Sequence, residues 1–153
     1  MRTLQQWLDE YSVSHQNKTN KMVHWVCVPA IMFSLMGLLV SLPFPFVEKS
    51  IVANWAAVVI ALALLFYLRL SFNMFLSMAI VMVGMLALNL QILSSGINLP
   101  LVSIGIFVAE WMGQFWGHKI EGKKPSFLED IQFLLIGPAW LMHFIYKKWG
   151  WKY

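Results

Sequence analysis

Long apolar segments separated by short polar gaps are the feature that most constrains the fold of this chain. Four segments, at about residues 21–42, 51–70, 72–93 and 99–118, each come close to the roughly 20 apolar residues that a helix needs to cross a hydrocarbon core. Only 12% of the 153 residues are charged, whereas an ordinary soluble domain has about 25%. The sequence therefore predicts a single all-α integral membrane domain over residues 1–153.

The residues before the first span predict a short amphipathic helix. Apolar residues recur there at the spacing of one helical face, namely at Leu4, Trp7, Leu8 and Tyr11. Thr3 and Gln6 fit a capping box at its start. We expect this helix to lie on the membrane surface, and we expect Asn20 to be the N-cap of the first span.

The last apolar segment, residues 127–148, is interrupted by Gly137-Pro138. Proline removes a backbone donor and kinks or ends a helix, so this segment is either a kinked fifth span or a re-entrant hairpin. The expected architecture is an N-terminal interfacial amphipathic helix followed by four or five transmembrane helices, the last of them broken at Gly137-Pro138.

Four crossings return the chain to the membrane face from which it started, and that face carries three of the four histidines, His15, His24 and His118. It also carries most of the basic residues, so the positive-inside rule places it in the cytoplasm. The membrane would be the inner membrane of a bacterium or the endoplasmic reticulum of a eukaryote. The lysines lie in polar gaps and form no basic stripe, which excludes nucleic acid as a partner and favours the lipid bilayer.

His15 and His24 are nine residues apart, which on one continuous helix would put them on opposite sides, at roughly 180°. The Asn-rich segment QNKTN between them supplies a turn that can aim both imidazoles at one point. A lone interfacial histidine is usually an amphipathic anchor, but these two with His118 favour a mononuclear metal site. Imidazoles without thiolates suit Fe, Zn, Cu or Ni, and the single cysteine, Cys27, is expected to be a packing residue.

Polar residues also follow one face of the fourth span. Glu110, Gln114 and Glu121 lie within about 40° of one another there, and His118 lies roughly 80° from Glu110. An ionisable group at membrane depth is costly and is a functional candidate. For Glu110 the alternative is a structural hydrogen bond to Gln114 or to a neighbouring helix.

Two motifs resemble the signatures of a known family. The first is HQNKTNKMVHWVCVP, residues 15–29, and the second is WMGQFWGHKIEGKKPS, residues 111–126. Together they resemble the small membrane 2-hydroxy fatty acid dioxygenases, typified by the fungal enzyme of phytosphingosine breakdown. In the fungal pattern one more residue lies between the His and the Glu of the second motif. The matching positions are His15, Asn17, Asn20, His24 and Pro29 in the first motif and Trp111, Gln114, Phe115, Gly117, His118, Glu121 and Pro125 in the second.

The resemblance implies an iron-dependent α-oxidation. A 2-hydroxy fatty acid and the co-substrate O2 would give the acid one carbon shorter, carbon dioxide and water, with the acyl chain among the apolar spans. His15, His24 and His118 would hold Fe(II), and His143 is a possible fourth ligand if Gly137-Pro138 folds the last segment back. If the last segment crosses as one helix, His143 lies near the far face, and we interpret His143 as a bystander.

Other residues near the two motifs have expected roles around this metal. Asn20, Gln114 and Glu121 would orient the imidazoles or the substrate hydroxyl, and Lys119 or Lys21 would offset the charge of the substrate carboxylate. The alternative is a non-catalytic membrane scaffold that uses the same histidines to bind metal or lipid, and it predicts bound metal without oxygen consumption. A transporter fits less well, because the chain has no internal symmetry.

Overall fold

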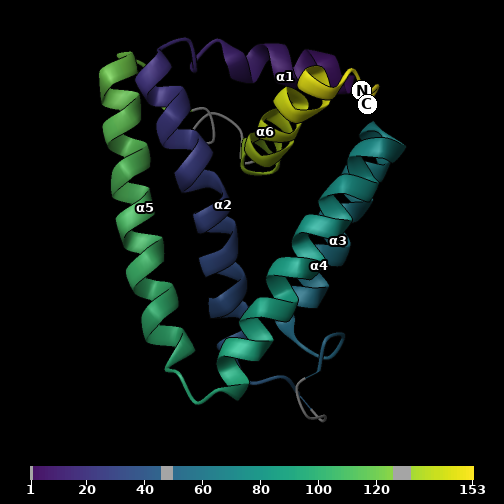
Figure 1. Ribbon diagram of the computed structural model, residues 1–153, viewed down its shortest axis with the longest axis vertical. Coiled ribbons are helices and arrows are strands. Elements are labelled where there is room, and N and C mark those ends of the chain that lie inside the picture. Colours follow the sequence, from purple (N-terminus) through teal and green to yellow (C-terminus); the bar gives the residue numbers. More distant parts are fainter. Residues whose placement is uncertain (1, 46–49, 126–131) are drawn as a thin grey trace.

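The computed structural model describes residues 2–45, 50–125 and 132–153, and this part of the chain is helical without strands (Figure 1). Residues 127–131 of the predicted last segment lie outside the described residues. The helices are α1 (Leu4–Ser12), α2 (Lys18–Ser41), α3 (Trp55–Leu70), α4 (Phe72–Ser94), α5 (Leu99–Glu121) and α6 (Phe133–Trp149). The all-α class is therefore confirmed.

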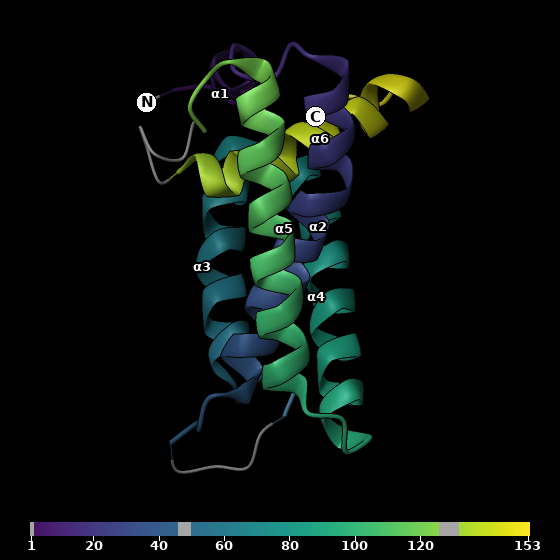
Figure 2. The same ribbon diagram turned by 90° about the vertical axis from the view of Figure 1, so that its left-hand side faces the viewer.

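Helices α2, α4 and α5 are long and apolar enough to cross a membrane. Helix α3 has 16 residues and is about 24 Å long, because residues 51–54 form bends ahead of it. Helices α2 to α5 alternate in direction along the long axis, so the start of α2 and the end of α5 lie at the same end of the molecule (Figures 1 and 2). The four apolar segments of the sequence predict this arrangement, because four crossings return the chain to the side on which it started.

The outer faces of these four helices are apolar. Val26 on α2, Leu62 on α3, Ile80 on α4 and Met112 on α5 each expose more than 60% of their surface. A soluble monomer rarely exposes continuous apolar surface on this scale. Lipid is the environment that such faces require.

Helix α1 lies across the end of the bundle where α2 begins, and its first turn forms as predicted (Figure 1). Thr3 Oγ1 accepts from the Gln6 backbone N–H at 3.3 Å, and Gln6 Oε1 accepts from the Thr3 N–H at 2.8 Å. We expected lipid to cover the apolar face of this helix, but α6 covers it instead. Trp7 meets Phe133 edge-on with ring centroids 5.3 Å apart. The buried residues of the face are Leu4, Trp7, Leu8 and Tyr11.

Helix α2 begins at Lys18, and the prediction of Asn20 as its N-cap is wrong. The Asn17 side chain accepts from the backbone N–H groups of Thr19 at 2.8 Å and Asn20 at 3.4 Å, so Asn17 is the cap. Asn20 lies within the first turn with its side chain buried. The turn between α1 and α2 is therefore confined to residues 13–17, which include His15.

Two glycines let α2 and α5 approach closely. A Cβ on Gly117 would lie 2.5 Å from Asn20 Oδ1, and a Cβ on Gly113 would lie 2.8 Å from Cys27 Sγ. Glycines four residues apart on one helix face are a common device for close contact between membrane helices. This contact sets the spacing between the start of α2 and the end of α5, where His24 and His118 lie.

Helix α6 continues through Gly137-Pro138, where we expected a break. It crosses the same end of the bundle as α1 and does not run along the long axis, so it is neither a kinked span nor a hairpin (Figures 1 and 2). Pro138 removes one backbone donor from the helix. The turn before it is tied to α3, because the Tyr67 hydroxyl donates to the Leu135 carbonyl at 2.6 Å.

Candidate metal centre

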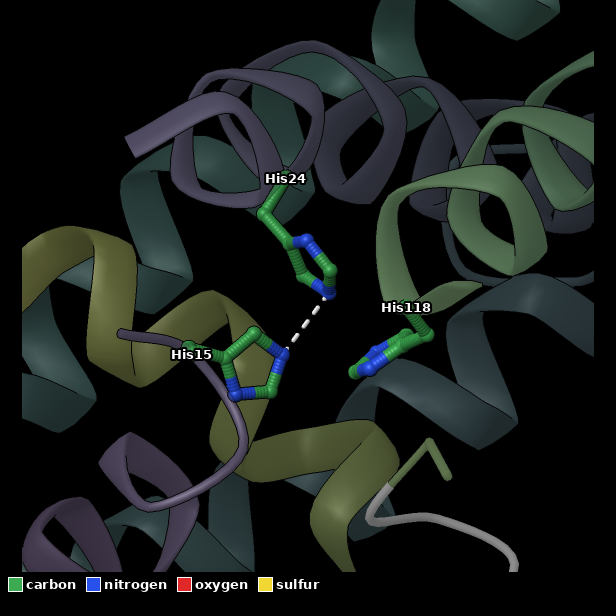
Figure 3. A group of neighbouring side chains, drawn as sticks. All are labelled: His15, His24 and His118. Atoms are coloured by element: carbon green, nitrogen blue, oxygen red, sulfur yellow. Dashed lines mark hydrogen bonds between the residues drawn. The ribbon is translucent and has the colours of Figure 1, made fainter. Parts of the chain in front are cut away.

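Three histidines from distant parts of the sequence meet at the end of the bundle. His15 lies in the turn between α1 and α2, His24 lies nearly two turns into α2, and His118 lies near the end of α5 (Figure 3). One nitrogen of each ring lies within 4.8 Å of the others, and the three residues are only 0%, 1% and 4% exposed. The predicted convergence of these three residues is therefore present.

The hydrogen bonds of His15 and His24 fix which ring nitrogens carry hydrogen. His15 Nδ1 lies 2.6 Å from the Tyr11 carbonyl oxygen, and His24 Nδ1 lies 2.9 Å from the Asn20 carbonyl oxygen. A carbonyl oxygen only accepts, so both Nδ1 atoms donate and both Nε2 atoms of the neutral rings carry lone pairs. These two Nε2 atoms lie 2.9 Å apart, the contact dashed in Figure 3. Two lone pairs this close repel unless a cation lies between them.

His118 adds a nitrogen that also lacks a partner. Its Nδ1 is buried and has no hydrogen-bond partner among the described residues, although a buried polar atom of this kind is normally satisfied. With two lone pairs already facing one another, this third imidazole completes a donor set that fits a metal ion. The set contains no thiolate, which suits Fe, Zn, Cu or Ni rather than a cysteine-type site.

The surroundings of His15 favour the neutral ring that a metal needs. Burial, followed by the proximity of His24, lowers its pKa from 6.5 to about 3. The ring stacks on Tyr11 with centroids 4.0 Å apart and planes 13° from parallel. Trp140 adds a second aromatic neighbour with its centroid 5.3 Å away. His15 is therefore held neutral and in a fixed orientation near physiological pH.

Glu121 fastens the turn that carries His15 to the end of α5. Its Oε1 accepts from the Gln16 backbone N–H at 2.8 Å, and its Oε2 accepts from the Asn17 N–H at 2.8 Å. Asn20 Nδ2 also donates to Oε2, at 3.1 Å. Charge-assisted bonds of this kind are stronger than neutral ones. Because Glu121 lies one turn after His118, a single carboxylate links the helix of one histidine to the turn of another.

Two further contacts hold the same turn. Lys123 Nζ donates to the Val13 carbonyl at 2.8 Å, and Asn20 Nδ2 donates to the Ser14 carbonyl at 3.3 Å. The clamp around His15 therefore consists of a carboxylate, an amide and an ammonium group. Asn20 and Glu121 are predicted from the sequence to lie around the metal. Lys123 is not, and its signal in the sequence is its position two residues after Glu121.

The other predicted site residues lie in different places. Gln114 is buried on α5 and lines a pocket beside the histidines. Lys119 is exposed and Lys21 is half-buried, and neither lines that pocket. His143 lies outside the histidine cluster, with its ring against Tyr153 at 5.0 Å.

The pocket beside the histidines lies between α2, α5 and the first half of α6. His24, His118 and Gln114 form its polar side. Apolar side chains form most of the remainder, including Val28, Ile31, Met32, Trp111, Phe133 and Leu134. The pocket thus joins a metal-binding corner to an apolar space, as a molecule with one polar end and one hydrocarbon end requires.

Tyr11 also belongs to this pocket, although the sequence predicts it only as part of an apolar helix face. It is buried and lines the pocket. A Cβ on Gly137 would lie 3.0 Å from the Tyr11 hydroxyl, so the glycine leaves room for it. Burial raises the pKa of Tyr11 above its usual value, so the group remains a donor. The feature of the sequence that points to Tyr11 as a residue of the site is its position four residues before His15.

The fold and the site define a small helical membrane protein in which three buried histidines can hold a metal ion. The chain belongs to the family described as 2-hydroxy-palmitic acid dioxygenase Mpo1-like, which it matches over residues 1–149. It is 25% identical to the 2-hydroxy-palmitic acid dioxygenase MPO1 of Saccharomyces cerevisiae over 154 aligned positions, covering 94% of this chain and 80% of the yeast protein. No solved structure matches the chain.

Proposed function

We propose that this protein is an Fe(II)-dependent dioxygenase that performs α-oxidation of 2-hydroxy fatty acids. The observation that carries the proposal is the pair of Nε2 lone pairs 2.9 Å apart, with a third imidazole beside them, at the polar end of an apolar pocket. The family and the yeast relative support the substrate class.

The proposed reaction balances without a further reductant. A 2-hydroxy acid and O2 give the acid one carbon shorter, carbon dioxide and water, and the substrate supplies all four electrons that reduce O2. The sequence accordingly needs no flavin or nicotinamide site, and it contains no Gly-rich dinucleotide motif.

His15, His24 and His118 would hold the iron. When bound, Fe(II) supplies the redox chemistry that lets O2 react with the acid at its 2-carbon. The chain itself keeps the three rings neutral and oriented. The Tyr11 and Asn20 carbonyls accept from two Nδ1 atoms, and this fixes the tautomer that leaves each Nε2 free.

The pocket residues would position the substrate. The hydrocarbon chain would lie against Val28, Ile31 and Met32, while the carboxylate and 2-hydroxyl face the histidines. The Tyr11 hydroxyl and the Gln114 amide are uncharged donors among the residues that line this pocket, and we assign them to hold the polar end of the acid. Lys119 and Lys21 would act only through their longer-range positive charge.

The metal end of the bundle would face the cytoplasm. Basic residues gather at this end, including Lys18, Lys21, Lys119, Lys123 and Lys124, which is the usual asymmetry of cytoplasmic segments. A substrate dissolved in the bilayer would enter from the side, and O2 partitions into the same hydrocarbon phase.

The proposal is tested with 2-hydroxyhexadecanoate labelled in its carboxyl carbon. The purified full chain, loaded with Fe(II) under O2, is expected to release labelled carbon dioxide and to form pentadecanoate in equal amounts. Bound iron without oxygen consumption would instead support the non-catalytic scaffold. Exposure of the chain to acid lacking the 2-hydroxyl is the control, and we expect no product from it.

A further inference from the structure

A second cavity lies on the opposite side of the α2–α6 crossing from the histidine pocket. Its walls come from α2, α4 and α6, and its lining side chains are hydrophobic without a charged group among the described residues. We call it the methionine cavity, because four of its lining residues are Met32, Met78, Met85 and Met142. No hydrogen-bonding network inside it offers a site to a polar ligand.

The methionine cavity and the histidine pocket share a wall. Val28, Met32 and Pro138 line both spaces, so the partition between them is one side chain thick. Met32 is half-buried and unbranched, and its thioether chain can change conformation at little cost. Gly137, which precedes Pro138 on α6, has no side chain to widen the partition.

We infer that the methionine cavity holds the far end of the hydrocarbon chain whose carboxyl end lies at the histidines. This inference rests on the proposed function, which places the polar end of the acid beside His24 and His118. Tyr11 and Phe133 close the histidine pocket on the α1 side, and the partition at Met32 leads away from them. The lining of the methionine cavity, beyond the partition, is hydrophobic and therefore suits a hydrocarbon chain.

The lining of the cavity predicts how strongly chain length affects binding. With the acid in water as the reference, each methylene held in a hydrophobic cavity adds roughly fourfold to affinity. Lipid gives a methylene a similar gain, so the cavity is tested by the difference between variants. Methionine side chains adapt to different occupants, so a range of long chains is accommodated. Affinity is therefore expected to rise with chain length until the cavity is full.

A matched pair of variants on α4 tests this inference. Val81 is half-buried and lines the methionine cavity but not the histidine pocket, whereas Val83 is 44% exposed on the outer face of the same helix. We expect Val81→Phe to weaken binding of 2-hydroxyhexadecanoate about tenfold while binding of 2-hydroxyoctanoate changes less than about twofold. Val83→Phe is expected to bind both acids as the natural protein does. Binding is measured by equilibrium dialysis of the full chain in lipid nanodiscs.

Met142→Ala provides a second test that does not depend on inserting a larger side chain. It enlarges the cavity, so we expect the preference to shift toward acids longer than sixteen carbons. Unchanged long-to-short ratios in both variants would overturn the inference and would place the chain in the bilayer instead. An equal loss for long and short acids in both variants would also overturn it.

Binding and turnover separate this inference from the proposed function. If Val81→Phe and Met142→Ala change the chain-length ratio as expected but the natural protein releases no carbon dioxide, the proposed reaction fails and the cavity assignment stands. If it releases carbon dioxide but Val81→Phe and Met142→Ala leave the chain-length ratio unchanged, the reaction stands and the cavity assignment fails.

Discussion

The Nε2 atoms of His15 and His24 lie 2.9 Å apart, although the Nδ1 atom of each ring donates to a backbone carbonyl. One ring belongs to a five-residue turn and the other to a membrane-length helix, so this contact depends on everything that holds the turn against α2 and α5. Glu121 provides the largest share of those bonds. The predictions below therefore concern the turn, the helix contact and the rings themselves.

Removing the Glu121 clamp should loosen the site without removing a ligand. In Glu121→Ala, the Gln16 and Asn17 N–H groups lose their acceptor, and the turn that carries His15 gains freedom. We expect affinity for Fe(II) to fall roughly 10- to 100-fold, as is common for residues that orient ligands. Metal affinity is measured by competition with a chelator.

The control for this variant is Glu10→Ala, which removes an exposed carboxylate that pairs with Arg2 at 3.1 Å. An exposed pair of this kind contributes little, so metal affinity should not change. If Glu121→Ala keeps full metal affinity and loses only turnover, Glu121 acts on the substrate directly and the clamp assignment is wrong.

Tyr11→Phe should affect turnover while the metal stays bound. The substitution removes a hydroxyl that faces the pocket and leaves the ring that stacks on His15. Loss of one hydrogen bond to the substrate predicts a decrease in kcat/KM of about tenfold. Tyr153→Phe is the matched control, because its hydroxyl donates to Gln5 near the surface. Equal activity in both variants would exclude Tyr11 from substrate positioning.

Gly117→Ala should separate α2 from α5. The added methyl group would meet Asn20 Oδ1 at 2.5 Å and Val23 Cγ1 at 3.2 Å, so the helices must move apart. Overpacking of this kind costs about 1–3 kcal/mol, and we also expect weaker metal binding because His118 shifts with α5. Thermal unfolding in detergent measures the first effect.

Gly105→Ala provides the comparison on the same helix. A methyl group there meets no atom within 4 Å, and alanine favours a helix more than glycine does. This variant should be as stable as the natural protein or slightly more stable. The close-contact account predicts that only Gly117→Ala lowers the Tm, and a similar decrease in both variants would contradict it.

Metal retention should persist in mildly acidic solution. Protons compete with a metal only near or below the pKa of the ligand, and burial lowers the pKa of His15 from 6.5 to about 3. The folded protein should therefore keep its metal at about pH 5, where an exposed histidine of ordinary pKa is mostly protonated. Metal content after dialysis across this range is the measurement. Release of metal between pH 7 and 6 would contradict a cluster whose rings burial keeps neutral.

Much of the site could be predicted because it depends on simple counting along the chain. Four apolar segments return the chain to its starting face, and this brings His118 to the level of His24. The clamp was harder to foresee. It depends on Asn17 rather than Asn20 capping α2, and both residues have the same intrinsic preference for that position. Only the packing of Asn20 against Gly117 and its bond to Glu121 separate the two.

The position of α6 could not be predicted from the sequence for a different reason. Gly137-Pro138 predicts a break from local backbone chemistry, but α6 remains continuous because its contacts with α1 and its bond from Tyr67 stabilise it. These contacts come from residues 60 or more positions away. Likewise, Tyr11 reads as one of four apolar residues on a helix face, and only the folded chain shows its hydroxyl in the pocket.

Metal content of the purified full chain tests the central claim most directly. Inductively coupled plasma mass spectrometry should find close to one iron per chain after anaerobic loading with Fe(II) and desalting, and His15→Ala, His24→Ala and His118→Ala should each lose most of it. His143→Ala, which alters a histidine outside the cluster, should retain it. Iron binding that is unchanged in the three cluster variants, or absent from the natural protein, would contradict a metal centre built from His15, His24 and His118.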